Sequence, residues 1–273
     1  MKLLGIGFSK TRIGQYKALF STLAEYQLAD NLGGFYDHYS FETWVNAAYE
    51  VAELVRIYEG LNEHKDSDLV SRLRDSLKGH ELYVVDSKDR SGRDFSFELA
   101  IAAKFCRYGY IVDFGHDADL KVQINGYDFF VECKRLKSSN KVQKRIKAGL
   151  SQLHKRYVKS NDPSKSRGLL MLSIAKTVNQ KLDLLEASDS KDLAEKAFAY
   201  NLAFTKKYKK YWQERVDQRT LGVGVIFDVP GVLKASKQLI MCHEVTINNS
   251  VPDNSPEYEL LCQVAGHVFL KRT

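Results

Sequence analysis

Apolar residues recur at helical spacing through the first third of the chain. One stretch follows the i, i+3, i+4 pattern of an amphipathic helix at Trp44, Ala47, Ala48, Val51, Leu54, Val55 and Tyr58. Similar spacing predicts helices over most of residues 11–85, and the polar segment 87–94 is typical of a junction. We therefore expect a helical region over residues 1–88 and a second domain over residues 89–273. Because the helical region has no recognisable catalytic motif, we expect it to cap the second domain or to bind a partner protein.

The second domain alternates between helical and strand patterns. Apolar residues at Phe97, Ala100, Ile101 and Phe105 predict a helix that ends at Gly109. The elements predicted after it are strands Tyr110–Phe114, Ala118–Ile124 and Tyr127–Lys134, helix Asn140–Tyr157, strand Gly168–Ala175, helical residues Leu182–Val216, and strands Leu221–Val229, Leu239–Thr246 and Glu259–Phe269. Strands that alternate with helices indicate an α/β fold.

The dipeptide Asn125-Gly126 lies between the two strands with the clearest period-two alternation. This dipeptide favours a two-residue type I′ turn, which fixes the pairing of the flanking strands. In that register the apolar pairs on one face are Ile124 with Tyr127, Val122 with Phe129, Leu120 with Val131, and Ala118 with Cys133. On the other face Asp119 lies opposite Glu132, and Asp117 lies opposite Lys134.

Two carboxylates on directly opposed strand positions lie about 4.5–5.5 Å apart and repel one another. A divalent cation between Asp119 and Glu132 would remove this repulsion, and carboxylate oxygens suit Mg²⁺ or Mn²⁺. The alternative is a salt-bridged hairpin surface on which Lys134 and Lys121 neutralise the two acids. The hairpin alone does not decide between the two.

The chain of 273 residues has a net charge of +7, and this charge is concentrated in one window. Residues 132–167 contain twelve lysine and arginine residues against two acids, a net charge of +10, so the rest of the chain sums to −3. Such a local excess predicts contact with phosphates. The residues expected to make it are Arg135, Lys141, Lys144, Arg145, Lys147, Lys155 and Arg156. A second basic and aromatic run, Lys206–Trp212, either stacks on bases or packs in the core.

The four cysteines are widely spaced, which suits reduced thiols in a cytoplasmic protein better than disulfides or a zinc ribbon. The first residues lack the apolar run of a signal peptide, and no stretch is long enough to span a bilayer. We therefore expect a cytoplasmic protein that does not contact membranes.

Asp119 followed by Glu132-Cys133-Lys134 resembles the motif of the PD-(D/E)xK nuclease superfamily, although Ala118 replaces the motif's proline. The order of helix, strand, hairpin, basic helix and strand is similar to the core of that superfamily. The resemblance implies a restriction-endonuclease-like core with a mixed central sheet flanked by helices. It also implies that Asp119 and Glu132 hold the metal and that Lys134 positions the attacking water. Glu98, as a third metal ligand, and Gln152 match further residues that some members use.

These observations predict a nuclease that depends on Mg²⁺ or Mn²⁺ and hydrolyses phosphodiester bonds. DNA is favoured over RNA because the resemblance is to a mostly DNA-cleaving superfamily, and bacterial defence or repair would suit such an enzyme. The alternative is a nuclease fold that no longer cuts and serves to bind nucleic acid or a partner protein. The complete set of Asp119, Glu132 and Lys134 favours the enzyme.

Overall fold

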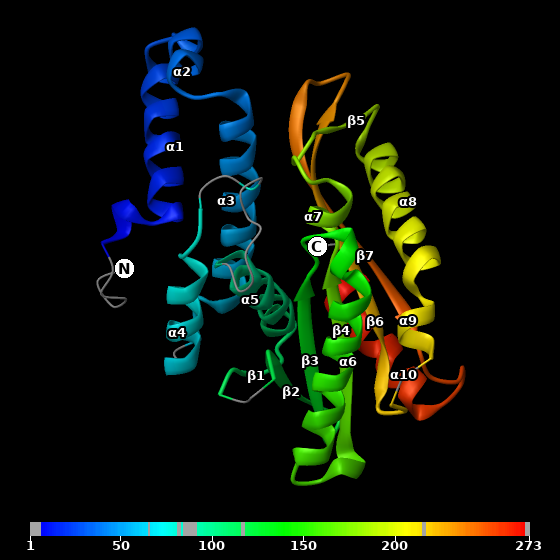
Figure 1. Cartoon of the computed structure of the whole chain (residues 1–273). Helices are drawn as coiled ribbons and strands as arrows, with labels where there is room; N and C mark the ends of the chain where they lie inside the picture. Colours follow the sequence, from blue (N-terminus) through cyan, green and yellow to red (C-terminus); the bar gives the residue numbers. More distant parts are fainter. Residues whose placement is uncertain are drawn as a thin grey trace.

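A mixed β-sheet forms the centre of the computed structural model, with helices on both faces (Figure 1). The structure describes residues 7–64, 66–80, 83, 92–115, 118–214 and 217–270. Within them the strands are β1 Val112–Asp113, β2 Leu120–Ile124, β3 Tyr127–Arg135, β4 Ser166–Ser173, β5 Leu185–Ala187, β6 Thr220–Leu233 and β7 Gln238–Asn249. The α/β class with a mixed, helix-flanked sheet is therefore confirmed.

The sheet is antiparallel at one edge and parallel in its middle. Its order is β1-β2-β3-β4-β6-β5, and β7 also pairs with β6. Strands β1, β2 and β3 run antiparallel, β3, β4 and β6 run parallel, and β7 returns antiparallel along β6. Strand β3 thus joins the hairpin to the parallel strands.

The helices lie in two groups around this sheet. Those before the sheet are α1 Arg12–Leu28, α2 Leu32–His38, α3 Phe41–Leu61, α4 Ser67–Ser76 and α5 Gly92–Arg107. Those after the hairpin are α6 Val142–Lys159, α7 Ala175–Val178, α8 Ser190–Tyr208, α9 Lys210–Gln213 and α10 Pro256–Val264. In Figure 1 the N-terminal helices stand to one side with α5 between them and the strands, and α8 stands at the opposite side. No helix among the described residues is long and apolar enough to cross a membrane.

The β2–β3 hairpin has the predicted register. Asn125 and Gly126 have φ angles of 51° and 80°, as a type I′ turn requires. Leu120 pairs with Val131, and the pairing continues without a shift to the turn. The apolar side chains of this face join the core beneath α5, whose members include Leu99, Ala102 and Phe105.

The opposite face of the hairpin is also covered. Phe130 and Glu132 are 6% and 1% exposed, and helix α6 packs over this face. Helix α6 lies close to the sheet at Gly149, where an added Cβ would be 2.6 Å from Cδ1 of Leu170 on β4. Ala118 belongs to the core beneath α6, so the expectation that it faces the same core as Cys133 is wrong.

Two predicted elements differ from the structure. The predicted strand Glu259–Phe269 is instead helix α10, followed by π-helical turns Ala265–Leu270. Ser255 caps α10 by accepting a hydrogen bond from the Tyr258 N–H, and Pro256 occupies its first turn. The predicted helix from Leu182 begins only at Ser190, because β5 pairs with β6 before it.

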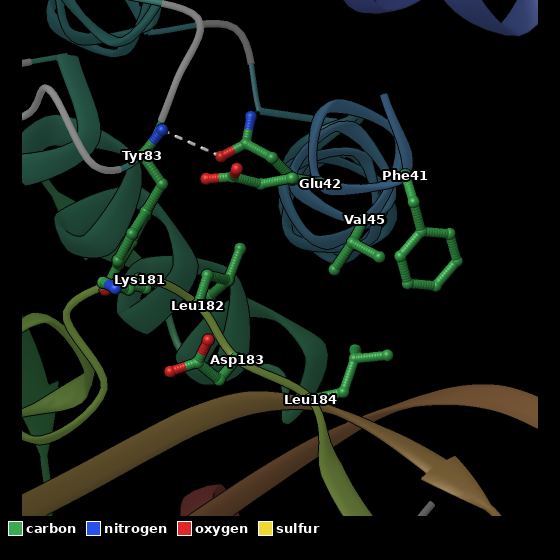
Figure 2. A pocket seen from close by; sticks show the side chains of 9 residues that line it. Phe41, Glu42, Val45, Tyr83, Lys181, Leu182, Asp183 and Leu184 are labelled. Atoms are coloured by element: carbon green, nitrogen blue, oxygen red, sulfur yellow. Dashed lines mark hydrogen bonds between the residues drawn. The ribbon is translucent and has the colours of Figure 1, made fainter. Parts of the chain in front are cut away.

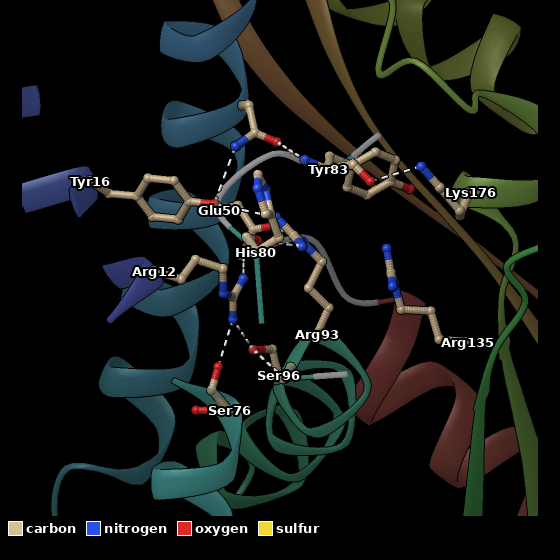
Figure 3. A network of polar contacts seen from close by, with 12 residues as sticks. Arg12, Tyr16, Glu50, Ser76, His80, Tyr83, Arg93, Ser96, Arg135 and Lys176 are labelled. Carbon is tan, nitrogen blue, oxygen red and sulfur yellow. Dashed lines mark hydrogen bonds and ion pairs between the residues drawn. The ribbon is translucent and has the colours of Figure 1, made fainter. Parts of the chain in front are cut away.

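A buried polar network joins the N-terminal helices to α5 (Figure 3). The carboxylate of Glu50, on α3, forms ion pairs with Arg12 and Arg93, and all three residues are at most 3% exposed. Arg12 also donates hydrogen bonds to the carbonyl of Ser76 (2.6 Å) and to Ser96 Oγ (3.3 Å). Burial would raise the pKa of Glu50, but the two guanidinium groups lower it below its usual value. The Glu50 carboxylate therefore links α3 to α1 and α5, and its partner Arg12 extends the network to α4.

Glu50→Gln should lower the free energy of unfolding by about 3–5 kcal/mol, because it leaves two buried guanidinium groups without their counter-ion. Glu59→Gln is the matched control, since Glu59 lies on the same helix and pairs with Arg107, but both side chains are exposed. The control should cost at most about 1 kcal/mol. Urea denaturation of both variants measures the difference, and equal effects would show that the Glu50 network does not hold these helices together.

Candidate active site

Asp119, Glu132 and Lys134 come together beside the open end of the hairpin. Lys134 Nζ forms an ion pair with Glu132 Oε1 and lies 3.7 Å from Asp119 Oδ2. Asp119 Oδ2 also accepts a hydrogen bond of 2.7 Å from the backbone N–H of Cys133. This bond ties the residue before β2 to the strand that carries Glu132 and Lys134. The expected position of Asp117 opposite Lys134 lies outside the described residues.

Glu98 reaches the same cluster from α5, and an arginine of the N-terminal region holds it there. Arg72 Nη1, from α4, donates a hydrogen bond of 2.6 Å to Glu98 Oε2. Arg72 Nη2 donates hydrogen bonds of 3.3 Å to the carbonyl oxygens of Phe114 and Ala118. Arg72 thus links Glu98 to the residue that precedes Asp119. No sequence motif marks Arg72, because its role depends on a contact between residues far apart in the chain.

Two carboxylates of this cluster, those of Glu98 and Glu132, hold protons unusually tightly. Burial and the charge of Asp119 raise the pKa of Glu98 to about 8 and that of Glu132 to about 7. Burial would lower the pKa of Lys134, but the carboxylates of Asp119 and Glu132 raise it above its usual value. Such shifts gather at functional sites more often than elsewhere.

These side chains have the donor chemistry of a divalent-cation site. Glu132 Oε2 is buried and has no hydrogen-bond partner among the described residues. Asp119 lies near enough to raise the pKa of both Glu98 and Glu132, and Mg²⁺ and Mn²⁺ prefer such oxygens. Among the described residues, however, no three acidic, histidine or cysteine side chains are arranged to hold an ion. Binding a metal at Glu132 would require its ion pair with Lys134 to open.

Helix α6 closes one side of the cluster. A Cβ added at Gly149 would lie 3.4 Å from Lys134 Cγ, so the helix axis passes close to the lysine. Gln152 and Arg156 lie one and two turns further along the same side of α6, and both are half-buried. The positive charge of Arg156 acts to lower the pKa of Glu132. Gln152 is therefore on the flank of α6 that faces the cluster.

The structure divides the predicted phosphate-binding residues into two groups. Lys141, Lys144 and Lys155 are exposed along α6, and Arg145, Lys147 and Arg156 are half-buried on its flanks. Arg135 is different, because its side chain is 6% exposed, lies 3.9 Å from Asp94 Oδ1 and stacks over the Tyr83 ring at 5.2 Å. Arg135 thus makes contacts within the protein, and its buried guanidinium group is not accessible to a phosphate in solvent.

A cavity of about 350 Å³ lies at the C-terminal end of α6. Its walls include Lys121, Phe130, Arg156 and Lys159. Phe130 is two residues before Glu132 on the same face of β3, so the cavity lies further along β3 from the carboxylates, and Glu98, Asp119 and Glu132 do not line it. Arg156 and Lys159 in its walls belong to the basic surface of α6, whereas Lys121 pairs with Asp128, which also lines the cavity.

A second cavity, of about 270 Å³, lies between α3 and the segment before β5 (Figure 2). Its apolar lining includes Val45 and Leu182, and its acids, Glu42 and Asp183, come from opposite walls. Tyr83 lines it and donates its backbone N–H to Asn46 Oδ1 at 2.9 Å. This cavity lies where the N-terminal helices meet the rest of the chain, and its acids do not converge as those at Glu132 do.

Comparisons with protein-family models and with curated proteins found no match to this chain. The function is therefore inferred from the geometry and chemistry of the site.

The raised pKa values of Glu98 and Glu132 predict how stability depends on pH. Both usual values are 4.5, so from about pH 5 to pH 8 the unfolded chain releases protons that the folded chain retains. The free energy of unfolding without metal should therefore fall as pH rises through this window, by at least about 1.4 kcal/mol, the equivalent of one pKa unit. Urea denaturation at several pH values in EDTA measures the slope.

A double variant, Glu98→Gln with Glu132→Gln, is the control for this slope. Burial also raises the pKa of Glu53 to about 7. Glu53 is present in both proteins, so it contributes equally to both slopes. The slope of the double variant should be clearly smaller than that of the wild type. Added Mg²⁺ should stabilise the wild type at pH 8 and leave the double variant unchanged, because ions stabilise only a folded state that binds them. Equal slopes would show that these carboxylates are not the perturbed groups.

Proposed function

We propose that this chain is a divalent-metal-dependent nuclease with a restriction-endonuclease-like core, and that DNA is its preferred substrate. The observation that carries the proposal is the buried carboxylate of Glu132, which contacts Lys134, borders Asp119 and leaves one oxygen without a partner among the described residues. The order α5, β1, β2, β3, α6, β4 supports the core, because it is the order that the resemblance implies. The basic surface along α6 suits a substrate with a phosphate backbone.

The alternative of a purely structural salt bridge explains these features less well. A buried carboxylate that served only stability would have both oxygens satisfied, because an unpaired buried acceptor costs about 1–3 kcal/mol. Glu132 Oε2 lacks such a partner within the described part of the chain. Glu98 and Glu132 also lie near Asp119, and the repulsion between these carboxylates adds to the cost of burying them. Sites that retain such a cost are more often functional than structural.

Each residue has a separate role in the proposal. Asp119 and Glu132 would hold Mg²⁺ or Mn²⁺, with Glu98 as the third carboxylate. When bound, such an ion lowers the pKa of water and stabilises charge on phosphoryl oxygens. Lys134 orients the attacking water and offsets the charge that develops on the phosphate. Gln152, on the facing flank of α6, positions the substrate.

Asp119→Asn and Glu132→Gln should each reduce cleavage by at least about 10²-fold, the usual cost of removing one group that stabilises developing charge. Lys134→Ala should do the same while retaining metal binding. Glu186→Gln is the control, because Glu186 lies on β5, away from the site, and its side chain is exposed and pairs only with Lys234, just after β6, among the described residues. Supercoiled, linear and single-stranded DNA and RNA, each with Mg²⁺, Mn²⁺ or EDTA, provide the substrates.

Cleavage by Glu132→Gln at the wild-type rate would overturn the assignment. If the wild type binds nucleic acid in a salt-dependent way but cuts none of these substrates with either metal, the chain is an inactive scaffold with a nuclease-like fold.

Arg72 gives the N-terminal region a role in the same site. Its charge acts to lower the pKa of Glu98, so without it Glu98 would hold its proton to still higher pH. Arg72→Ala should therefore weaken Mn²⁺ binding at pH 7 by about 10-fold, the lower cost of losing a residue that orients a metal ligand. Raising the pH to about 9 should recover most of the affinity.

Isothermal titration calorimetry with Mn²⁺ measures this change without any cleavage. Arg107→Ala is the control, because Arg107 pairs with Glu59 on the surface. Unchanged Mn²⁺ affinity in Arg72→Ala at pH 7 would remove Arg72 from the site. The N-terminal region would then remain only a candidate surface for a partner protein.

A further inference from the structure

A second aromatic and basic surface lies at the junction of α8 and α9. The sequence from Lys206 to Gln213 contains four lysines and no acidic residue. Trp212, with 1% exposure, belongs to the core, but Tyr208 and Tyr211 are only partly buried. Their ring centroids are 6.3 Å apart with planes tilted by 36°. Both rings also pack against the core, where the Tyr208 ring centroid lies 4.7 Å from that of Phe204, so the two rings are only partly exposed among the lysines.

Lysine ammonium groups surround the two rings. Lys207 Nζ lies 5.2 Å from the centre of the Tyr208 ring, and Lys210 Nζ lies 5.1 Å from that of Tyr211. Lys147 Nζ, from α6, lies 5.8 Å from the Tyr211 ring. These separations are within the range of about 6 Å for cation–π contact. Lys147 thus joins the tyrosines to the basic surface of α6.

An open cavity of about 340 Å³ lies beside Lys147 on α6. Its other lining residues are Leu150, Ser151, His154 and Asp217. Asp217 does not make the cavity repel anions, because the guanidinium group of Arg219 donates two hydrogen bonds to its carboxylate and His154 Nδ1 lies 2.7 Å from it. The cavity combines an apolar side chain with polar groups, and its volume falls in the range of about 300–1,000 Å³ that suits small ligands.

The tyrosines and the carboxylates lie on opposite flanks of α6. Gly149 and Arg156 are on the flank that faces the carboxylates, and Lys147 and His154 are on the other flank. Exposed Lys144 lies on the outer face between the two flanks, as does Lys155. A helix with its side chains is about 10–12 Å across. A few nucleotides would therefore cross α6 from the carboxylates to Tyr211, with their phosphates over lysines.

We propose that Tyr208 and Tyr211 form a stacking platform for unpaired nucleic-acid bases, and that the lysines around them bind the adjoining phosphates. The path across α6 rests on the proposed nuclease function, but the platform itself does not. Bases within a duplex already stack on their neighbours, so this surface selects single strands or duplexes with an unpaired segment. The stacking expectation for Trp212 does not hold, because its ring is buried.

The test measures binding of the full chain in EDTA, so that no cleavage occurs. Fluorescence anisotropy compares a short single strand, its duplex, and the same single strand with one abasic nucleotide, each made as DNA and as RNA. Tyr211→Ala should weaken single-strand binding by about 5- to 100-fold, the effect of one stacked base. Tyr211→Phe should retain it, and duplex affinity should be unchanged. Tyr58→Ala is the control, since Tyr58 is 68% exposed on α3.

The abasic strand keeps the test decisive if Tyr211→Ala is poorly folded. With the wild type, placing the abasic nucleotide at each position in turn should identify one or two at which affinity falls. Replacing Lys147, Lys207 and Lys210 by glutamine should reduce the slope of log affinity against log salt by about 0.7 for each phosphate that these lysines neutralise. If the abasic strands all bind as tightly as the intact strand, or if Tyr211→Ala weakens duplex and single strand equally, the platform is refuted.

Failure of this inference is separable from failure of the proposed function. If the carboxylate variants abolish cleavage while abasic strands bind normally, the nuclease proposal is supported and the stacking platform is refuted. If the abasic strands bind weakly but no substrate is cut with either metal, the stacking platform is supported and the nuclease proposal is refuted. Equal abasic effects in DNA and RNA would show that the platform reads bases alone, and a difference would show that the sugar also contributes.

Discussion

The register of the β2–β3 hairpin is the constraint on which the site and the sheet both depend. A slip of one residue would move Leu120 and Val131 out of the α5 core and would carry Glu132 into it. The positive φ angles at Asn125 and Gly126 set this register locally. Strand β3 then transmits it, because β4 pairs with β3 along eight residues and β6 continues from β4. A two-residue turn therefore sets the positions of Asp119 and Glu132 relative to one another.

The parts of the fold that could be predicted are those with strong local signals. The hairpin, the basic helix and the strands β4 and β6 each have a turn dipeptide or a clear apolar period in the sequence. Glu259–Phe269 failed as a predicted strand because its apolar residues suit helix and strand alike, and the cap at Ser255 favours the helix. Strand β5 has only three residues, and its pairing with β6 is a tertiary contact.

The candidate site was predictable only in part, for a related reason. Asp119 directly precedes β2, and Glu132 and Lys134 lie on β3, so the register of one hairpin brings the three together and their proximity follows from local sequence. Arg72 reaches Glu98 because α4 packs against α5, and no pattern in the sequence predicts that contact. Charge counting likewise grouped Arg135 with the exposed lysines, although Tyr83 and Asp94 bury it. Composition shows how much positive charge a surface carries, and packing decides which residues present it.

The carboxylate of Glu50 has a consequence for how this protein can be divided or recombined. Arg93 lies on α5, the first helix of the sheet-bearing part, yet its counter-ion comes from α3. A cut in the polar segment before α5 would therefore separate a buried base from its acid and expose the apolar side of Ile57 and Leu61. A gene fusion that removed the helices before α5 would leave Arg93 buried without its counter-ion, Glu50. The smallest transferable unit of the fold must include α1 and α3 together with the strands.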